Sequence, residues 1–346
     1  MLIILKDSTI KDVAKEAGVS IATVSRVLNN KNRVSESARK RVIKAIEKLG
    51  YTPDPIARTM IKKQTKSVGL LVPTLQNEYW AHLAEVIQNK LWEKGYTLML
   101  CTARHKSISE QEQYLKSFIE RRMDGIIVGA LDIPDDERMG LPQVIRRGIP
   151  VVAFEKKIPG VHRVAGDDIS GAQKAVEHLI MLGHTDIAYL GPCDMEGRNI
   201  GYRNAHSKNN IMVNESLLFN TSFNVKSGYS ATLDILKRGV KFTAIFCAND
   251  LIAFGAIRAL LDLGKSVPGD VAVVGYDDIT KARFFNPRLT TVAQPIEKIG
   301  ETIVELLMEI IEKGNVNPRN IIFDAELVVR ESCGAKQANE LKQMGS

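Results

Sequence analysis

Residues 9–25 read TIKDVAKEAGVSIATVS, and this short stretch constrains the fold more than any other part of the chain. Its first half carries apolar residues at i, i+3, i+4 and i+7, the spacing of one helix face: Ile10, Val13, Ala14 and Ala17. Thr9 can cap this helix, and Gly18 suits its end because glycine adopts the left-handed conformation without strain. The pattern predicts a short amphipathic helix followed at once by a turn.

The second half of the stretch predicts another helix, which Ser20 can cap. Its inward face is apolar: Val24, Val27 and Leu28. Its outward face is mixed: Ile21, Ala22, Ser25 and Arg26. A helix-turn-helix presents the start of its second helix to base edges in the DNA major groove, where arginine pairs with guanine and methyl groups contact thymine. A helical hairpin in another kind of small bundle would show the same pattern. The distribution of charge is therefore needed to distinguish a DNA-binding helix-turn-helix from such a hairpin.

Positive charge is concentrated in the first fifth of the chain. Residues 1–66 contain 15 Lys and Arg against 6 Asp and Glu, whereas the whole chain has 47 against 40. The remainder is therefore slightly acidic. This asymmetry is typical of a module that neutralises DNA phosphates, and it favours the DNA-binding interpretation.

A third helix is predicted between a Ser35 cap and Gly50, and it closes a small core with one apolar face: Ala38, Val42, Ala45, Ile46 and Leu49. The prolines of the Tyr51–Pro55 segment then break the helix, and residues 56–61 are long enough for one more helical turn. We expect a headpiece over 1–51 and a linker over 52–66.

From Ser67 onward, short apolar runs alternate with amphipathic helices. The runs predicted as strands are 68–72, 98–101, 126–128, 151–154, 187–190, 244–247 and 271–274. Continuous apolar runs indicate parallel sheets covered on both faces, so the fold class is α/β, with doubly wound lobes behind a small all-α headpiece. Ligands of such sheets bind beyond the carboxyl ends of the strands, where Glu155, Asn249 and Asp277 lie.

The order of these motifs resembles the LacI/GalR family of bacterial transcription regulators. The resemblance runs from TIKDVAKEAGVSIATVSRVLNN through EHLIMLGHTDIAYLGP, AIFCANDLIAFGAIRAL and VAVVGYDDI to PRLTTVAQP. It implies a periplasmic-binding-protein-like core over 67–334, with lobe 1 at about 67–161 and 293–323 and lobe 2 at about 162–292 and 324–334. Residues 335–346 form a tail, which is too short for the leucine heptads that make some relatives tetramers.

The resemblance also implies the DNA-contacting residues. In this family the linker forms a hinge helix that inserts an apolar wedge into the minor groove, and Met60 stands where relatives usually have Leu. The predicted DNA-binding residues are Thr9, Ser20, Ile21, Ala22, Thr23, Ser25, Arg26, Asn29, Ala57 and Met60.

The effector cleft is the second site that the resemblance implies. Its predicted residues are Tyr79, Trp80, Glu155, Arg198, Phe223, Asn249 and Asp277. Aromatic faces beside carboxylates and an amide suit a sugar ring. Two departures bear on the effector: the loop between Pro192 and Arg198 is shorter than in purine-responsive relatives, and Glu78 replaces a common Pro, which we expect to add charge at the cleft mouth.

Two other functions compete with that of a regulator. An enzyme is disfavoured because no G-x-G-x-x-G follows a predicted strand, no P-loop is present, and the six histidines show no metal-type spacing. An exported sugar-binding protein would leave the basic headpiece without a purpose, and MLIIL is too short for a signal peptide. Residues 1–8 precede the usual family start, and we expect a frayed arm or a misplaced start there.

The sequence therefore predicts a cytoplasmic, homodimeric repressor that binds near-palindromic operator DNA and has no catalytic residues, no metal and no cofactor. A small molecule, most simply a sugar, is expected to control its operator affinity. A purine-type corepressor or a phosphocarrier protein remains the alternative, and relatives respond in both directions. The four cysteines, at 101, 193, 247 and 333, are expected to be reduced and partly buried thiols.

Overall fold

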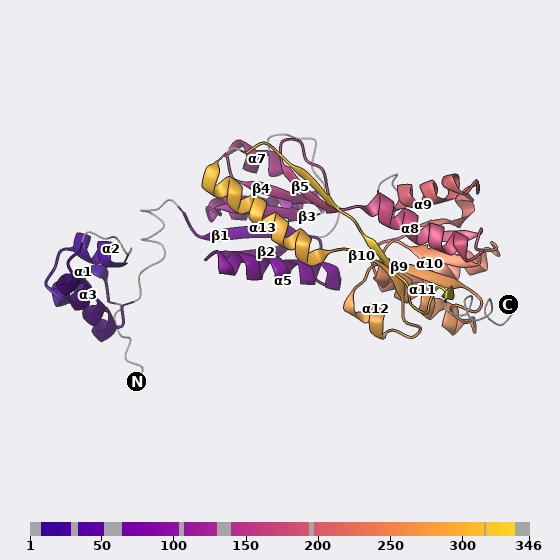
Figure 1. Ribbon diagram of the computed structural model, residues 1–346, viewed down its shortest axis with the longest axis horizontal. Helices are drawn as coiled ribbons and strands as arrows, with labels where there is room; N and C mark the ends of the chain where they lie inside the picture. The colour runs from indigo at the N-terminus through magenta and orange to yellow at the C-terminus, as the bar shows by residue number, and fades with distance from the viewer. Residues whose placement is uncertain are drawn as a thin grey trace, which may run out of the picture. The chain divides into compact units, whose positions relative to one another are not determined.

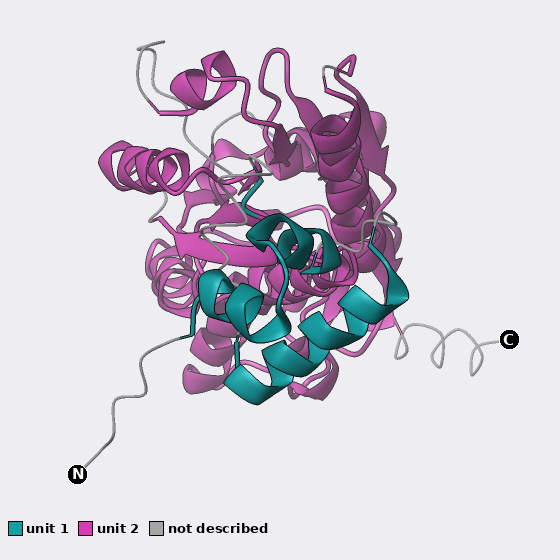
Figure 2. Ribbon diagram, turned by 90° about the vertical axis from the view of Figure 1, so that its left-hand side faces the viewer, with its two compact units in different colours: residues 1–65 teal, residues 66–346 magenta. Residues whose placement is uncertain are grey.

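The computed structural model describes residues 8–28, 34–51, 64–103, 107–129, 140–193, 197–314 and 316–335. The chain divides into two compact units, residues 1–65 and 66–346 (Figure 2). The predicted linker over 52–66 lies mostly outside the described residues, and so do Asn29, Ala57 and Met60.

The first unit contains three helices: α1 (Ile10–Ala17), α2 (Ile21–Leu28) and α3 (Glu36–Leu49). Thr9 and Asp12 form a reciprocal capping box at α1, and Ser35 caps α3. Gly18 and Gly50 end α1 and α3 in the left-handed conformation, at φ of 62° and 57°. The caps predicted from the sequence are confirmed.

A small apolar core joins these helices. Its buried members are Val13, Ala14, Ala17, Val24, Val27, Val42 and Ala45, and the half-buried Ile10, Leu28, Ile46 and Leu49 pack against them. Each helix buries the stripe that its periodicity predicts, which leaves the opposite faces to solvent.

The second unit contains two six-stranded sheets, each covered by helices (Figure 1). The first sheet, in lobe 1, has the order β11-β5-β4-β3-β1-β2 and is parallel throughout. Its strands are β1 (Ser67–Val72), β2 (Thr97–Thr102), β3 (Gly125–Gly129), β4 (Val151–Phe154), β5 (His162–Gly166) and β11 (Asn320–Phe323). Its helices are α5 (Glu78–Glu93), α6 (Ile108–Glu120), α7 (Leu141–Arg146) and α13 (Ile296–Lys313).

The second sheet, in lobe 2, has the order β12-β10-β9-β8-β6-β7, and only β12 is antiparallel to its neighbour among the described pairings. Its strands are β6 (Ile187–Gly191), β7 (Leu218–Asn220), β8 (Ala244–Cys247), β9 (Ala272–Asp277), β10 (Thr290–Ala293) and β12 (Glu326–Val328). The helices of this lobe are α8 (Asp168–Met181), α9 (Gly197–Lys208), α10 (Val225–Lys237), α11 (Asp250–Asp262) and α12 (Thr280–Phe284), with a 3₁₀ turn at Glu215–Leu217.

The seven predicted strands are present, and the structure adds β5, β7, β10, β11 and β12. The predicted lobe boundary at Val161 needs correction, because β5 pairs with β4 in the first sheet and the chain leaves lobe 1 only after Gly166. The sequence HRVAG hides this strand, since a polar pair opens it and glycine ends it. The chain returns to lobe 1 after β10 and crosses back after β11 (Figure 1).

A close helix pairing positions the groups between the lobes. A Cβ added at Gly201 of α9 would lie 2.3 Å from the carbonyl oxygen of Ile169 in α8. Only glycine permits this approach, which brings the first turns of α8 and α9 side by side. Asp168 and Arg198 stand in those two turns.

Candidate functional site

The exposed face of α2 is the candidate nucleic-acid surface of the first unit. Ile21, Ala22 and Arg26 are exposed, whereas Thr23 and Ser25 are half-buried. The hydroxyl of Ser20 accepts a hydrogen bond from the backbone N–H of Thr23 at 3.2 Å. A cationic guanidinium and two apolar side chains therefore lie on the outer side of a short, well-capped helix.

Three predicted DNA-binding residues, Thr9, Ser20 and Thr23, also have local structural roles. The Thr9 hydroxyl donates to Asp12 at 2.7 Å, and the hydroxyls of Ser20 and Thr23 lie 2.9 Å apart. Their substitution would disturb the helix start as well as any DNA contact. Among the residues that the structure describes, the side chain of Arg26 forms no hydrogen bond or ion pair, so its substitution tests DNA contact more directly.

A cavity of about 380 Å³ lies between the two lobes of the second unit. Both lobes contribute to its lining: Glu155, Lys156, Arg163, Ala165, Gly166, Asp167, Asp168, Ile169, Tyr189, Pro192, Gly197, Arg198, Phe223, Ala248 and Ile322. Three of the predicted effector residues, Glu155, Arg198 and Phe223, are among them. This volume is in the range of small-molecule sites.

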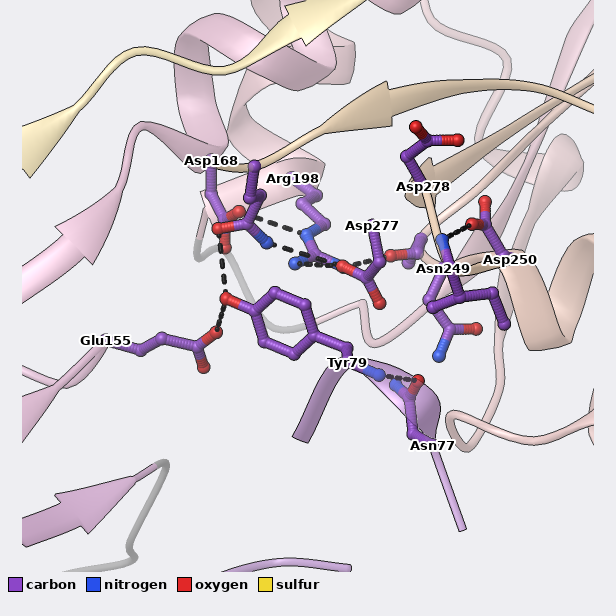
Figure 3. Close-up of polar contacts among 12 residues, drawn as sticks. Asn77, Tyr79, Glu155, Asp168, Arg198, Asn249, Asp250, Asp277 and Asp278 are labelled. Carbon is purple, nitrogen blue, oxygen red and sulfur yellow. Dashed lines mark hydrogen bonds and ion pairs between the residues drawn. The ribbon is translucent and has the colours of Figure 1, made fainter. Parts of the chain in front are cut away.

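Arg198 is the centre of the charged network beside this cavity (Figure 3). Its Nε lies 3.1 Å from Asp168, and its Nη2 lies 3.1 Å from the carboxylate of Asp277. Its Nη1 donates to the carbonyl of Ala248, and the guanidinium carbon lies 3.8 Å from the ring centroid of Tyr276. The side chain is 11% exposed, so the arginine is held by the protein on nearly every side.

Glu155 follows β4 and faces this network from lobe 1. Its φ of 66° lies in the left-handed region, a strained conformation for a residue with a Cβ, and such strain is often found at functional sites. Loss of hydration raises the pKa of Glu155 to about 8, and the negative charge of Asp168 adds to this rise. At neutral pH this carboxyl group is largely protonated and can donate a hydrogen bond.

Tyr79 and Asp277 contact this site without lining the cavity. The Tyr79 hydroxyl donates to Gln294 at 3.1 Å and lies 3.5 Å from Glu155. Gln294 in turn donates to Asp277 at 3.3 Å. Burial raises the pKa of Asp277 to about 6, although Arg198 opposes this rise. A chain of hydrogen bonds thus links α5 of lobe 1 to β9 of lobe 2.

Trp80 and Asn249 lie elsewhere than expected. The Trp80 ring packs edge-on against Phe154 at 5.6 Å between centroids, and a Cβ on Gly129 would lie 2.7 Å from it, so the indole is part of the lobe 1 core. Asn249 caps α11 by accepting a hydrogen bond from the N–H of Ile252 at 2.9 Å. Both have structural roles, and neither belongs to the cavity lining.

Asp168 and Gln294 were missed by the sequence reasoning. Asp168 follows the capping residue of α8, and in sequence the pair looks like an ordinary helix start. Gln294 stands just beyond β10, where the chain crosses between lobes. A polar residue next to the lobe crossover that the resemblance implied near residue 293 was the available signal.

Glu78 does not add charge to the mouth of this cavity. It pairs with Lys281 of α12 at 2.9 Å and lines a separate groove with Phe254 and Phe284. The expected effect on the effector cleft is therefore corrected: Glu78 joins the lobes on another face.

Within the described ranges, no group of three or more His, Cys, Asp or Glu side chains is arranged to hold a metal ion. All four cysteines are free, and three of them are buried, as predicted. Among the helices that the structure describes, none is both long and apolar enough to cross a membrane.

The raised pKa of Glu155 predicts a pH-dependent stability. Between pH 4.5 and about 8, the native carboxyl keeps a proton that the unfolded chain releases, so stability falls as pH rises through this window. Glu155→Gln removes this loss and should raise the urea midpoint at pH 8.5, with the gain disappearing near pH 5. Glu326→Gln, at an exposed position, is the control. An equal effect of Glu155→Gln at every pH would contradict the assigned protonation.

Comparison with known proteins identifies the parts of this chain. Residues 9–54 match the family profile of bacterial regulatory proteins, lacI family, and residues 176–333 match a periplasmic binding protein-like domain. The chain is 37% identical over 333 residues to the HTH-type transcriptional repressor PurR of Yersinia pestis, covering 94% of this chain and 96% of the relative.

Solved structures agree with this assignment. A lac repressor dimer bound to operator and the anti-inducer ONPF superposes with a TM-score of 0.83 at 27% identity, covering 95% of this chain and 99% of that one. The cellobiose complex of the transcriptional regulator CelR gives 0.71 at 32% identity, over 94% and 99% of the two chains.

The helix-turn-helix headpiece, the two-lobed core and the similarity along nearly the whole chain lead to one conclusion. The protein belongs to the lacI family of bacterial regulatory proteins and is a DNA-binding transcriptional repressor with a ligand-binding core.

Proposed function

We propose that the effector of this repressor is a carbohydrate or a similarly hydroxylated small molecule, bound in the cavity between the lobes. Phe223 is the observation that carries this proposal: its ring is 42% exposed, and it lines the cavity together with Arg198 and Glu155. An exposed aromatic face next to charged hydrogen-bonding groups suits a ring with C–H faces and hydroxyl edges. Two similar regulators were solved with cellobiose and with ribose.

A purine corepressor is the second candidate, because PurR is a similar repressor. The five residues between Pro192 and Arg198 argue against it, since this loop is shorter than in some purine-responsive relatives and the contacts that those members make from it cannot be carried over to this chain. A phosphocarrier protein as activator is the third candidate. Such a partner would leave the cavity without a regulatory ligand, so ligand screening distinguishes the three.

The mechanism proposed is a shift between lobe arrangements. A ligand that touches Glu155 of lobe 1 and Arg198 of lobe 2 favours one arrangement, and this preference sets the operator affinity. Such coupling is typically about 1–3 kcal/mol. The segment over 52–66 joins the headpiece to the core along the chain and would transmit the change. Ligands that lower and ligands that raise operator affinity both fit this scheme.

We further propose that the repressor is a cytoplasmic homodimer that binds near-palindromic DNA. A groove between α5 and α12 exposes an apolar surface in which Phe254 and Phe285 stack at 4.4 Å between centroids. Phe284, beside them, is 82% exposed. An exposed aromatic side chain beside an apolar groove is typical of a protein interface, and a second copy is the proposed occupant.

The headpiece is expected to supply the DNA binding. Removal of residues 1–66 should abolish binding to a palindromic operator, whereas the intact protein should show a steep dependence on salt. Arg26→Ala should cost about 1–3 kcal/mol and relax the preference at one symmetric base-pair position. Fluorescence anisotropy over a set of operator variants measures both effects. Equal weakening on every variant would instead make Arg26 a phosphate contact.

The effector cavity can be tested by thermal shift with sugars and purines. A ligand at about 100 times its Kd stabilises the native state by roughly 2.7 kcal/mol, which gives a measurable rise in Tm. Phe223→Ala should abolish the shift of the active sugar while the ligand-free Tm changes little. Met212→Ala, at a 92% exposed position, is the matched control. If only purines raise the Tm, the effector is a purine corepressor and not a sugar.

The proposed dimer face can be tested by measuring the oligomeric state of one variant. Phe284→Arg places a charge in the apolar surface, so the protein should sediment as a monomer and bind operator at least tenfold more weakly. Met181→Arg, which changes a 75% exposed apolar residue elsewhere, should leave a dimer. A Phe284→Arg protein that sediments as a dimer would place the interface on another face.

A further inference from the structure

We propose that the effector presents hydroxyl or amine donors and carries no phosphate or carboxylate group, and that Asp168 enforces this choice. This inference rests on the proposed effector cavity and narrows the chemistry of its ligand. Arg198, which the family resemblance implies as a clamp for hydroxyls or carboxylates, then acts mainly as a positioning residue.

The geometry of Arg198 is the first support. A guanidinium has five N–H donors, and here its three nitrogens already contact Asp168, the Ala248 carbonyl and Asp277. The ring of Tyr276 covers one of its faces. An anionic ligand would have to displace a carboxylate from this arrangement before it could form a bidentate pair.

The charge balance is the second support. The carboxyl groups of Glu155, Asp168 and Asp277 lie around the single buried guanidinium of Arg198, so acids outnumber bases in this network beside the cavity (Figure 3). Loss of hydration is the main cause of the raised pKa of Glu155, and the negative charge of Asp168 adds to it. A phosphate placed beside Arg198 would meet the carboxylate of Asp168 at short range, with little water to screen the repulsion.

The other bases of the lining, Arg163 and Lys156, belong to lobe 1. The Nε of Arg163 donates to the carbonyl of Glu155, and its Nη1 lies 3.1 Å from the side chain of Asn320. Lys156 also lines the cavity, and so does the acidic Asp167. An anionic ligand would pair with Lys156 or Arg163 rather than with Arg198. The comparison of ligands therefore includes anionic sugars.

Asp168 is placed to select the ligand. It opens α8 in lobe 2, lines the cavity and keeps 31% of its side chain exposed while it pairs with Arg198. An ionised carboxylate only accepts hydrogen bonds, so it attracts hydroxyl or ammonium donors and repels anions. Arg198 fixes the orientation of the Asp168 carboxylate. The ligand therefore meets a hydrogen-bond acceptor whose position is already set, and this acceptor determines the specificity.

The experiment compares matched ligands on the full-length protein by thermal shift and calorimetry. The probes are glucose, ribose and cellobiose, together with glucosamine, glucose 6-phosphate, ribose 5-phosphate and glucuronate. At least one neutral or amino sugar should bind at least tenfold more tightly than its anionic counterpart. Tighter binding of a phosphate or carboxylate than of its neutral partner would overturn the proposal while leaving a carbohydrate effector in place.

Variants then test Asp168 itself. Asp168→Asn should weaken the best neutral ligand at least tenfold and reduce its preference over the matched anion, whereas Asp324→Asn, at a 77% exposed carboxylate, should change neither. Circular dichroism of the ligand-free variants establishes that they fold. The comparison of neutral with anionic ligands uses the wild-type protein, so it does not depend on the variants. Unchanged affinity and preference in Asp168→Asn would remove this residue from the specificity. Failure of every probe on the wild-type protein would instead contradict the carbohydrate proposal.

Discussion

The buried pairing of Arg198 with Asp168 and Asp277 is the interaction on which the interlobe site depends. A guanidinium this enclosed needs compensating charge, because an unpaired buried ion costs several kcal/mol. The three residues come from α9, α8 and β9, so the pairing fixes the relative positions of three elements of lobe 2. Gly201 makes the pairing possible by allowing α8 and α9 to touch.

The connection between the lobes depends on the same network. Tyr79 of lobe 1 reaches Gln294 at a chain crossover, and Gln294 reaches Asp277, which contacts Arg198. Any ligand that moves Glu155 or Arg198 therefore acts on groups that already join the lobes. This arrangement gives a physical basis for coupling in a family whose members are regulators with a ligand-binding core.

Much of the fold could be predicted from local chemistry. The caps at Thr9, Ser35 and the two left-handed glycines of the headpiece follow from the needs of helix ends, and the apolar strands of the core follow from burial on both faces. The short strand β5 could not be predicted, since its polar start and glycine end conceal it and its pairing with β4 is a tertiary contact. The lobe boundary was misplaced for the same reason.

By itself, the sequence determined the helix-turn-helix, the α/β class and the family, because these depend on periodicity, capping and ordered motifs along the chain. It also indicated Glu155, Arg198 and Phe223, which stand near strand or helix ends and line the cavity. Only the tertiary structure placed Trp80 in a core, moved Glu78 to another groove, and brought Asp168 and Gln294 into the site. Such roles depend on which side chains meet across lobes, and that is decided by packing between segments far apart in the sequence.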